Sequence, residues 1–160
     1  MPHIYALGDV NGRGAFTHTS YNDFEIVSQN LLDGKDRKVS DRVPAYALYI
    51  DPPLGRAGMN EAQVRESGRP ALVATRPMNR VSRANERGEN LGFMKVFADA
   101  ETREILGVAL LGIEGDEVMQ SLLQAMKAGT TVDTIIATMH VHPTVSELVP
   151  TLLGDLKPLQ

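Results

Sequence analysis

A histidine and a glutamate near the carboxyl end of the chain have the residue types and spacing of a general acid–base pair. His142 precedes Pro143, and Glu147 comes five residues after the histidine, in the stretch His-Val-His-Pro-Thr-Val-Ser-Glu. A carboxylate close to an imidazole orients the ring and stabilises its protonated form. The chain contains no cysteine, and no serine stands in an obvious nucleophile setting. The sequence therefore predicts a base and leaves open which group it deprotonates.

Other interpretations of the same stretch remain open at this point. Thr144 and Glu147 have the spacing of a capping box, which would give the glutamate a purely structural role at a helix start. His142 can equally be a histidine whose hydrogen bonds are satisfied in a turn. His140 and His142 lie on one side of an extended segment, as two ligands of a zinc or copper ion would. Such a site needs a third ligand, and the sequence does not place one.

Composition limits the class of protein. The chain has 160 residues, 42% of them hydrophobic and 22% charged, which is typical of one soluble domain or of one domain with part of another. The net charge is -4 and no basic run exceeds a dipeptide, which argues against a nucleic-acid or membrane-surface partner. No apolar stretch has the length of a membrane span, and the first residues do not resemble a signal peptide. We therefore expect a cytoplasmic protein.

The elements that open the chain are a strand, a glycine-rich turn and a helix. The apolar residues 4–7 predict a buried strand, and a core strand so close to residue 1 suggests a chain cut from a longer one. Residues 8–14 form the glycine-rich turn. A helical pattern then predicts a helix with Thr17 as its N-cap and Gly34 at its end. A turn of this kind at a helix N-terminus is an anion-binding corner.

Several known loops compete for this corner. A dinucleotide-binding fingerprint requires a third glycine where the chain has Thr17. An EF-hand loop that began at Asp9 would place Arg13 at a ligand position. A phosphoesterase loop requires further metal-binding motifs that the sequence lacks. The remaining local interpretation is a turn in which Asp9 caps the backbone.

The longer string around the turn resembles a flavin-binding segment. Residues 5–10 (Tyr-Ala-Leu-Gly-Asp-Val), followed by Phe-Thr-His at 16–18, resemble the second flavin-binding segment of the pyridine nucleotide-disulfide oxidoreductases. This family includes glutathione reductase, dihydrolipoamide dehydrogenase and mercuric reductase. The resemblance implies that Gly8, Asp9 and Thr17 bind FAD. Asp9 would bond the ribityl chain, and the backbone at Thr17 would face the pyrimidine end of the isoalloxazine.

The remaining residues predict an α+β fold. Residues 35–42 are polar and predict a linker. Strands are expected at 43–50, 71–77, 92–98 and 105–113, the last two joined in a hairpin by the turn at 99–102, with a break at 51–55. Helices are expected after a capping box at Asn60, at 116–128 with Gly129 beyond, and after Thr131, and Pro150 is expected to kink a last helix near Ser146. Strands grouped before helices favour an antiparallel sheet covered on one side.

Three stretches in this part resemble the dimerisation domain of the same family. They are residues 51–59, residues 105–108 with Gly112, and residues 142–147, which resemble the family's C-terminal signature. The resemblance implies that 1–40 is the end of an FAD-binding domain and that 41–160 is the dimerisation domain. A homodimer would form through 41–160. The mercuric reductases' C-terminal cysteine pair is missing, so a dedicated mercuric reductase is not expected.

The resemblance also assigns roles. In the intact enzyme, which would use FAD and NAD(P)H, His142 and Glu147 would act as acid/base towards the partner subunit's redox-active cysteine pair. The chain alone is expected to bind neither cofactor and to be inactive. A free-standing dimerisation or binding module without chemistry is the alternative from another class. A third alternative is a His-x-His metal-binding protein.

Overall fold

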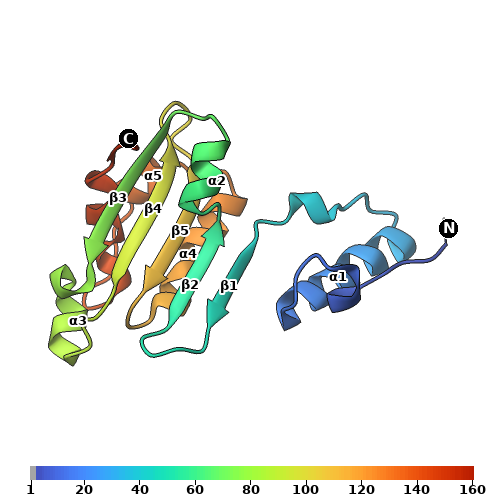
Figure 1. Cartoon of the computed structure of the whole chain (residues 1–160), viewed down its shortest axis with the longest axis horizontal. Helices are drawn as coiled ribbons and strands as arrows, with labels where there is room; N and C mark the ends of the chain where they lie inside the picture. Colours follow the sequence, from blue (N-terminus) through green and yellow to red (C-terminus); the bar gives the residue numbers. More distant parts are fainter. Residues whose placement is uncertain (1–2) are drawn as a thin grey trace. The chain divides into compact units, whose positions relative to one another are not determined.

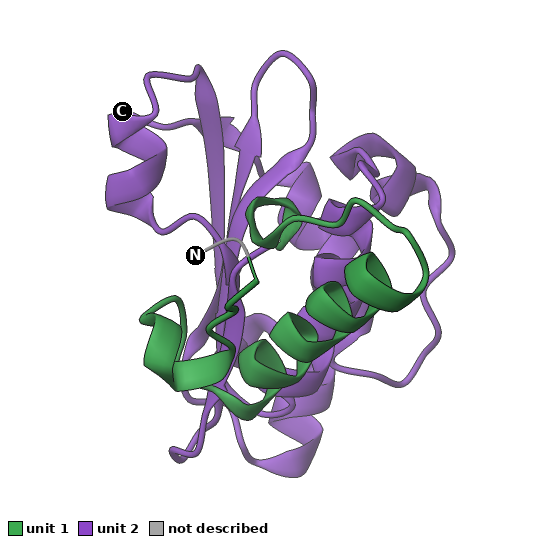
Figure 2. Ribbon diagram, turned by 90° about the vertical axis from the view of Figure 1, so that its right-hand side faces the viewer, with its two compact units in different colours: residues 1–42 green, residues 43–160 purple. Residues whose placement is uncertain are grey.

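The computed structural model describes residues 3–160. The chain divides into two compact units, Met1–Arg42 and Val43–Gln160, which are coloured green and purple in Figure 2. The first unit contains the short 3-10 helices η1 (Gly8–Asn11) and η2 (Val39–Asp41) and the long helix α1 (Thr17–Leu32). No helix of the described part is both long and apolar enough to span a membrane.

Residues 4–7 do not form the predicted buried strand. They belong to no helix or strand, and Ile4 and Tyr5 are exposed. A strand is stabilised by hydrogen bonds to a neighbouring strand, and the sheet formed within residues 3–160 does not include 4–7. The apolar run therefore pairs with no strand among the described residues.

Helix α1 begins one residue earlier than predicted. Phe16 is the N-cap and Thr17 is the first helical residue, so the prediction of Thr17 as the cap is wrong. The hydroxyl of Thr19 accepts a hydrogen bond from the Phe16 N–H at 3.2 Å, which satisfies a donor at the helix entrance from inside the first turn. Gly34, with a φ of 64°, follows the end of the helix as predicted.

The segment 35–42 is more than a linker. It contains η2 and folds back on α1, because the Arg37 N–H donates to the Asn30 side chain at 2.8 Å and the Asn30 amide donates to the Arg37 carbonyl at 2.9 Å. At its end Arg42 pairs with Asp23 of α1. The polar residues that predicted a linker are instead hydrogen-bonded to polar side chains of α1.

The second unit is an α+β domain, as predicted. Its antiparallel sheet has six strands in the order β1-β2-β5-β4-β3-β6. The strands are β1 (Ala45–Leu48), β2 (Leu54–Gly58), β3 (Ala71–Pro77), β4 (Phe93–Asp99), β5 (Ile105–Leu111) and β6 (Lys157–Pro158). The predicted strand 71–77 and the hairpin are confirmed, and the strand predicted at 43–50 is shorter. The predicted break at 51–55 ends at residue 53, because β2 begins at Leu54.

Helices cover the two faces of this sheet unequally. The helical elements are α2 (Glu61–Glu66), η3 (Met78–Arg80), α3 (Ser82–Arg87), α4 (Gly115–Lys127), α5 (Val132–Ala137), η4 (Ser146–Leu148) and α6 (Val149–Gly154). Figure 1 shows α4, α5 and α6 behind the sheet and α2 in front of it. The larger apolar core includes Val96, Val108 and Leu122. In a smaller cluster, Val64 of α2 packs with Phe97 of β4 and Leu106 of β5.

The capping signals predicted three of these helices correctly. Asn60 and Gln63 form the reciprocal capping box of α2, with both hydrogen bonds at 2.9 Å, and Thr131 caps α5. Helix α4 ends before Gly129, which has a φ of 64°. The expected kink at Pro150 is wrong, because this proline lies in the first turn of α6, where a missing N–H removes no helical hydrogen bond.

Candidate functional site

His142 and Glu147 form the contact that the sequence predicts. His142 Nδ1 lies 2.8 Å from Glu147 Oε2. The histidine side chain is 72% exposed, whereas the glutamate side chain is only 12% exposed. The peptide bond between His142 and Pro143 is cis. The carboxylate thus fixes one nitrogen of the ring, and the other nitrogen, Nε2, belongs to an exposed ring that can reach a group on another molecule.

The backbone around Glu147 is held independently of its side chain. The Thr144 hydroxyl accepts a hydrogen bond from the Glu147 N–H at 3.1 Å and donates to the Val141 carbonyl at 2.7 Å. Val145 and Val149, on either side, are buried in the larger core. Among the hydrogen bonds of residues 3–160, the capping box is half formed. The Thr144 hydroxyl caps the Glu147 N–H, but the Glu147 carboxylate bonds His142 and not the Thr144 N–H. The glutamate is therefore part of the pair as well as of the helix start.

The metal interpretation lacks a third ligand. Within the described part of the chain, no group of three or more histidine, aspartate or glutamate side chains lies close enough together to hold a metal ion. His140 and His142 therefore stand without the further donor that zinc or copper requires.

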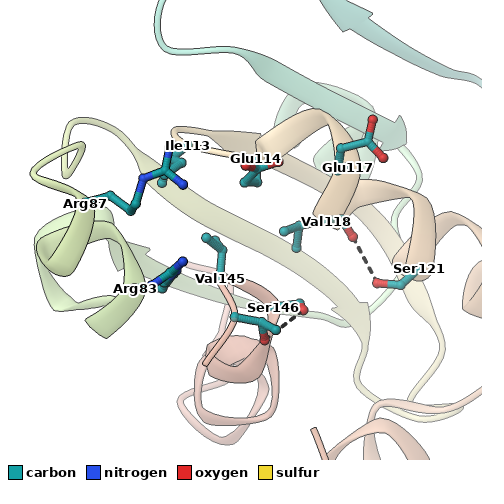
Figure 3. Close-up of a pocket in the computed structure, with 10 residues that line it drawn as sticks. Arg83, Arg87, Ile113, Glu114, Glu117, Val118, Ser121, Val145 and Ser146 are labelled. Atoms are coloured by element: carbon teal, nitrogen blue, oxygen red, sulfur yellow. Dashed lines mark hydrogen bonds between the residues drawn. The ribbon is translucent and has the colours of Figure 1, made fainter. Parts of the chain in front are cut away.

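A cavity of about 350 Å³ borders the segment that carries the pair. Figure 3 shows Arg83 and Arg87 of α3 on one side of it and Glu117 and Ser121 of α4 on the other. Residues 144–146 form part of its wall, whereas His142 is not among the lining residues. Sequence reasoning left residues 78–91 unassigned and so did not predict the two arginines.

Gly8, Asp9 and Thr17 lie together around the N-terminus of α1. Gly8 has a φ of 72°, and a Cβ at this position would lie 2.9 Å from Ser20 Oγ. The Ser20 hydroxyl donates to Asp9 Oδ1 at 3.3 Å, and the Asp9 side chain is exposed. An exposed carboxylate accepts hydrogen bonds from hydroxyl groups, and the first amides of a helix favour negative charge. The chemistry of this corner therefore suits a ligand that has hydroxyl groups and a negative charge, as FAD has.

A buried carboxylate that the sequence did not single out lies beneath this corner. Asp23 is 4% exposed and accepts hydrogen bonds from the Gly8 N–H at 3.0 Å and from the Asn11 amide at 2.6 Å. It also pairs with Arg42. Burial alone would raise the pKa of Asp23, but the hydrogen bonds from Arg42, Gly8 and Asn11 outweigh it and hold the pKa below its usual value. Asp23 lies at helical spacing from Thr19 and Ile26, and the three form the buried face of α1. This spacing was the signal in the sequence from which the burial of Asp23 could have been predicted.

Comparisons with known proteins agree with this architecture. The pyridine nucleotide-disulphide oxidoreductase dimerisation domain matches residues 44–153. The probable pyridine nucleotide-disulfide oxidoreductase RclA of Escherichia coli is 35% identical over 97% of this chain and 35% of its own length. A dihydrolipoyl dehydrogenase of Haloferax volcanii is 32% identical over 93% of this chain and 31% of its own length.

A solved structure supports the same relationship. The HOCl-induced flavoprotein disulfide reductase RclA from Escherichia coli superposes with a TM-score of 0.88 at 34% identity, over 94% of this chain and 35% of that one. The chain thus spans about a third of the length of the curated relatives it matches. It belongs to the pyridine nucleotide-disulphide oxidoreductases, and residues 44–153 are the dimerisation domain of that family.

Proposed function

We propose that this chain supplies the dimer interface and the acid/base pair of a homodimeric, FAD-dependent, NAD(P)H-linked disulfide reductase. The observation that carries the proposal is the 2.8 Å contact between Glu147 and the exposed ring of His142, placed on a dimerisation domain. The relatives' names support the reaction class, since one is described as a flavoprotein disulfide reductase.

The exposure of His142 explains how a chain without cysteine takes part in thiol chemistry. A base that points outwards from a dimerisation domain can serve a thiol of the partner subunit. In the proposed reaction NAD(P)H, a proton and a disulfide give NAD(P)⁺ and two thiols. His142 Nε2 accepts the proton of the attacking thiol, because the thiolate is the nucleophile, and returns it to the sulfur that leaves when the S–S bond breaks. Glu147 stabilises the ring while it carries that proton.

The corner formed by Gly8, Asp9 and Thr17 is proposed to hold part of the flavin. When bound, FAD would carry the electrons of NAD(P)H to the disulfide. Asp9 would accept a hydrogen bond from a ribityl hydroxyl, and Gly8 lets the turn pack closely on α1. The positive end of α1 at Thr17 favours negative charge in its neighbourhood. We therefore propose that the first unit is the end of an FAD-binding domain.

The chain by itself is proposed to be inactive, because it has no cysteine to form the redox pair. The parent enzyme would act in the cytoplasm, where thiols are kept reduced. A dimerisation module without chemistry would have the same fold but no use for the His142–Glu147 contact, so a variant of the histidine separates the two.

The test is His142→Ala in the full-length enzyme that contains this chain. We expect reduction of the flavin by NAD(P)H at the wild-type rate and steady-state disulfide turnover lowered by about 10²- to 10⁴-fold, since one proton-transfer group is lost. His140→Ala, two residues away, is the matched control and should retain turnover. Unchanged turnover in His142→Ala would contradict the acid/base role.

Hybrid dimers test whether the histidine serves the partner. Subunits with His142→Ala are mixed with subunits whose redox cysteines are replaced by serine, each inactive alone. If the site is composite, the hybrid contains one complete site and regains turnover. If the histidine served its own subunit, neither half of the hybrid would be complete and activity would stay absent.

A further inference from the structure

We propose that Asp23 is a positioning residue for the flavin. Its carboxylate holds the Gly8–Asn11 turn against α1 and so fixes Asp9 at the start of the helix. This inference rests on the proposed function, in which Asp9 contacts FAD. Asp23 itself is buried and does not reach the surface of the corner.

One face of α1 attaches the turn at three points. The Gly8 N–H and the Asn11 amide both donate to Asp23 Oδ2, at 3.0 and 2.6 Å. The Ser20 hydroxyl donates to Asp9 Oδ1 at 3.3 Å. Ser20 and Asp23 are three residues apart in a helix and therefore neighbours on its surface. Both ends of the turn and the carboxylate between them are thus fixed to the same stretch of helix.

Arg42 occupies the other oxygen of Asp23. It pairs with Oδ1, and its Nε donates to the Asn22 side chain at 2.9 Å. Its side chain is 15% exposed and that of Asp23 is 6% exposed. A buried carboxylate is costly unless it is paired and hydrogen-bonded. Here Arg42 balances the charge, which leaves Oδ2 entirely to the turn.

Apolar packing does little to hold this turn. Within the described residues of the first unit, Ile26 is the buried hydrophobic side chain, while Tyr21, Phe24 and Leu31 of the same helix are more than half exposed. The side chain of Asp9 is exposed as well. Within the described residues of the first unit, the contacts that hold the Asp9 carboxylate near the first turn of α1 are therefore mainly those of the polar network centred on Asp23.

Loss of the Asp23 charge should loosen the turn selectively. Asparagine in place of Asp23 keeps an oxygen for Gly8 but leaves Arg42 without its anion. The turn would then sample other positions, and the ordering of Asp9 would have to be supplied by the flavin on binding. The expected consequence is weaker FAD binding and a changed flavin environment.

The experiment measures FAD binding by the full-length enzyme and its variants. FAD is added to the apoenzyme, the dissociation constant is measured by flavin fluorescence, and the midpoint potential of the bound flavin is recorded. For Asp23→Asn we expect the dissociation constant to rise at least tenfold and the potential to shift. Asp36→Asn is the matched control, because the Asp36 side chain is 90% exposed, and both quantities should stay at the wild-type values.

Arg42 provides an independent pair of variants in case Asp23→Asn does not fold. Arg42→Lys keeps the positive charge beside Asp23 and should bind FAD within a few-fold of wild type, whereas Arg42→Gln should bind at least tenfold more weakly. Circular dichroism shows that each variant compared is folded. Rescue by lysine supports the charge-dependent clamp, which a loss of packing alone would not explain.

Two results overturn the inference, and they are distinguishable from failure of the proposed function. If folded Asp23→Asn or Arg42→Gln binds FAD like the wild type, the positioning role is wrong while the flavin assignment stands. If Asp36→Asn loses as much affinity as Asp23→Asn, the effect is one of general charge. If the wild-type full-length enzyme binds no FAD, the proposed function fails, and this inference fails with it.

Discussion

At position 147 the backbone and the side chain of one glutamate have different partners. The N–H is bound by the Thr144 hydroxyl, and the carboxylate is bound by the ring of His142. A capping role and an acid/base role therefore use different atoms and can be removed separately. The same stretch of six residues, 142–147, both starts a helical segment and orients an imidazole.

Glu147→Gln should leave the fold intact and reduce turnover. The amide is isosteric, the Thr144 cap remains, and the free energy of unfolding should change by no more than about 0.5 kcal/mol. Disulfide turnover of the full-length enzyme should fall by at least about tenfold, because the negative charge that stabilises the protonated ring is gone. Urea denaturation measures the free energy of unfolding, and steady-state kinetics measures the disulfide turnover.

Thr144→Val should have the opposite effect to Glu147→Gln: it should lower stability and leave disulfide turnover largely unchanged. It removes the hydroxyl that caps the Glu147 N–H and should lower the free energy of unfolding by about 1 kcal/mol. If Glu147→Gln retained full turnover while lowering stability as Thr144→Val does, Glu147 would be a structural residue only.

At the scale of elements, the packing of α4 on β2 depends on a residue without a side chain. A Cβ at Gly55 would lie 2.4 Å from the Gly115 carbonyl oxygen and 2.9 Å from Met119 Cβ. Gly55 does not have a positive φ. The glycine is therefore needed for the close approach of the helix and not for the backbone conformation of the strand.

Gly55→Ala should destabilise the second unit by about 1–3 kcal/mol, the usual cost of overpacking. Gly154→Ala is the control, because no atom lies within 4 Å of a Cβ there and the φ is ordinary. The control should be neutral or slightly stabilising, since alanine restricts the unfolded chain. Urea midpoints of both variants test this, and equal midpoints would show that α4 can move away at little cost.

The elements that sequence predicted correctly carry their information locally. Asn60 and Thr131 cap their helices through residues three positions away, and β4 and β5 are separated only by the short polar turn that predicted their hairpin. β2 was missed because Leu-Gly-Arg-Ala-Gly has low strand propensity. It becomes a strand by pairing with β1 and β5 on both sides. Residues 4–7 show the converse, since they have the propensity but no described partner.

The same distinction between local and distant partners explains which residues of the site could be predicted from the sequence. His142 and Glu147 are five residues apart, so their contact could be predicted from spacing and from the family resemblance. Asp23 is 15 residues from Gly8 and 19 from Arg42. No periodicity within α1 indicates those partners, because they come from segments before and after the helix. The burial of Asp23 could be inferred from its spacing within α1, but its partners are found only once the chain is folded.

At the scale of the whole molecule, each unit contains a buried aspartate in its charged form. Asp23 serves the first unit. In the second unit Asp99, 6% exposed, accepts hydrogen bonds from the Glu101 and Thr102 N–H groups at 2.9 Å each. These bonds, with Arg69 at 3.6 Å, outweigh burial and hold the pKa of Asp99 below its usual value. Both aspartates stabilise the fold as anions.

The sign of the pH effect follows from these lowered pKa values. A carboxyl group whose pKa is lower in the folded than in the unfolded chain contributes stability above the unfolded pKa, about 3.9 for aspartate. That contribution is lost as the pH falls from there through the folded pKa. The part of the free energy of unfolding that these two aspartates contribute should therefore be constant near neutral pH and should decrease below about pH 4.

Asp99→Asn isolates the contribution of the second unit to the loss of stability below about pH 4. The variant should be less stable than the wild type at pH 7, because the turn after β4 loses a charged acceptor, and its stability should decrease less steeply below pH 4. Hydrogen exchange of the β4 and β5 amides, followed against pH, reports on this unit alone, whereas exchange of the α1 amides should remain as in the wild type. Equal slopes for the wild type and Asp99→Asn would mean that other carboxylates govern the acid sensitivity of the hairpin.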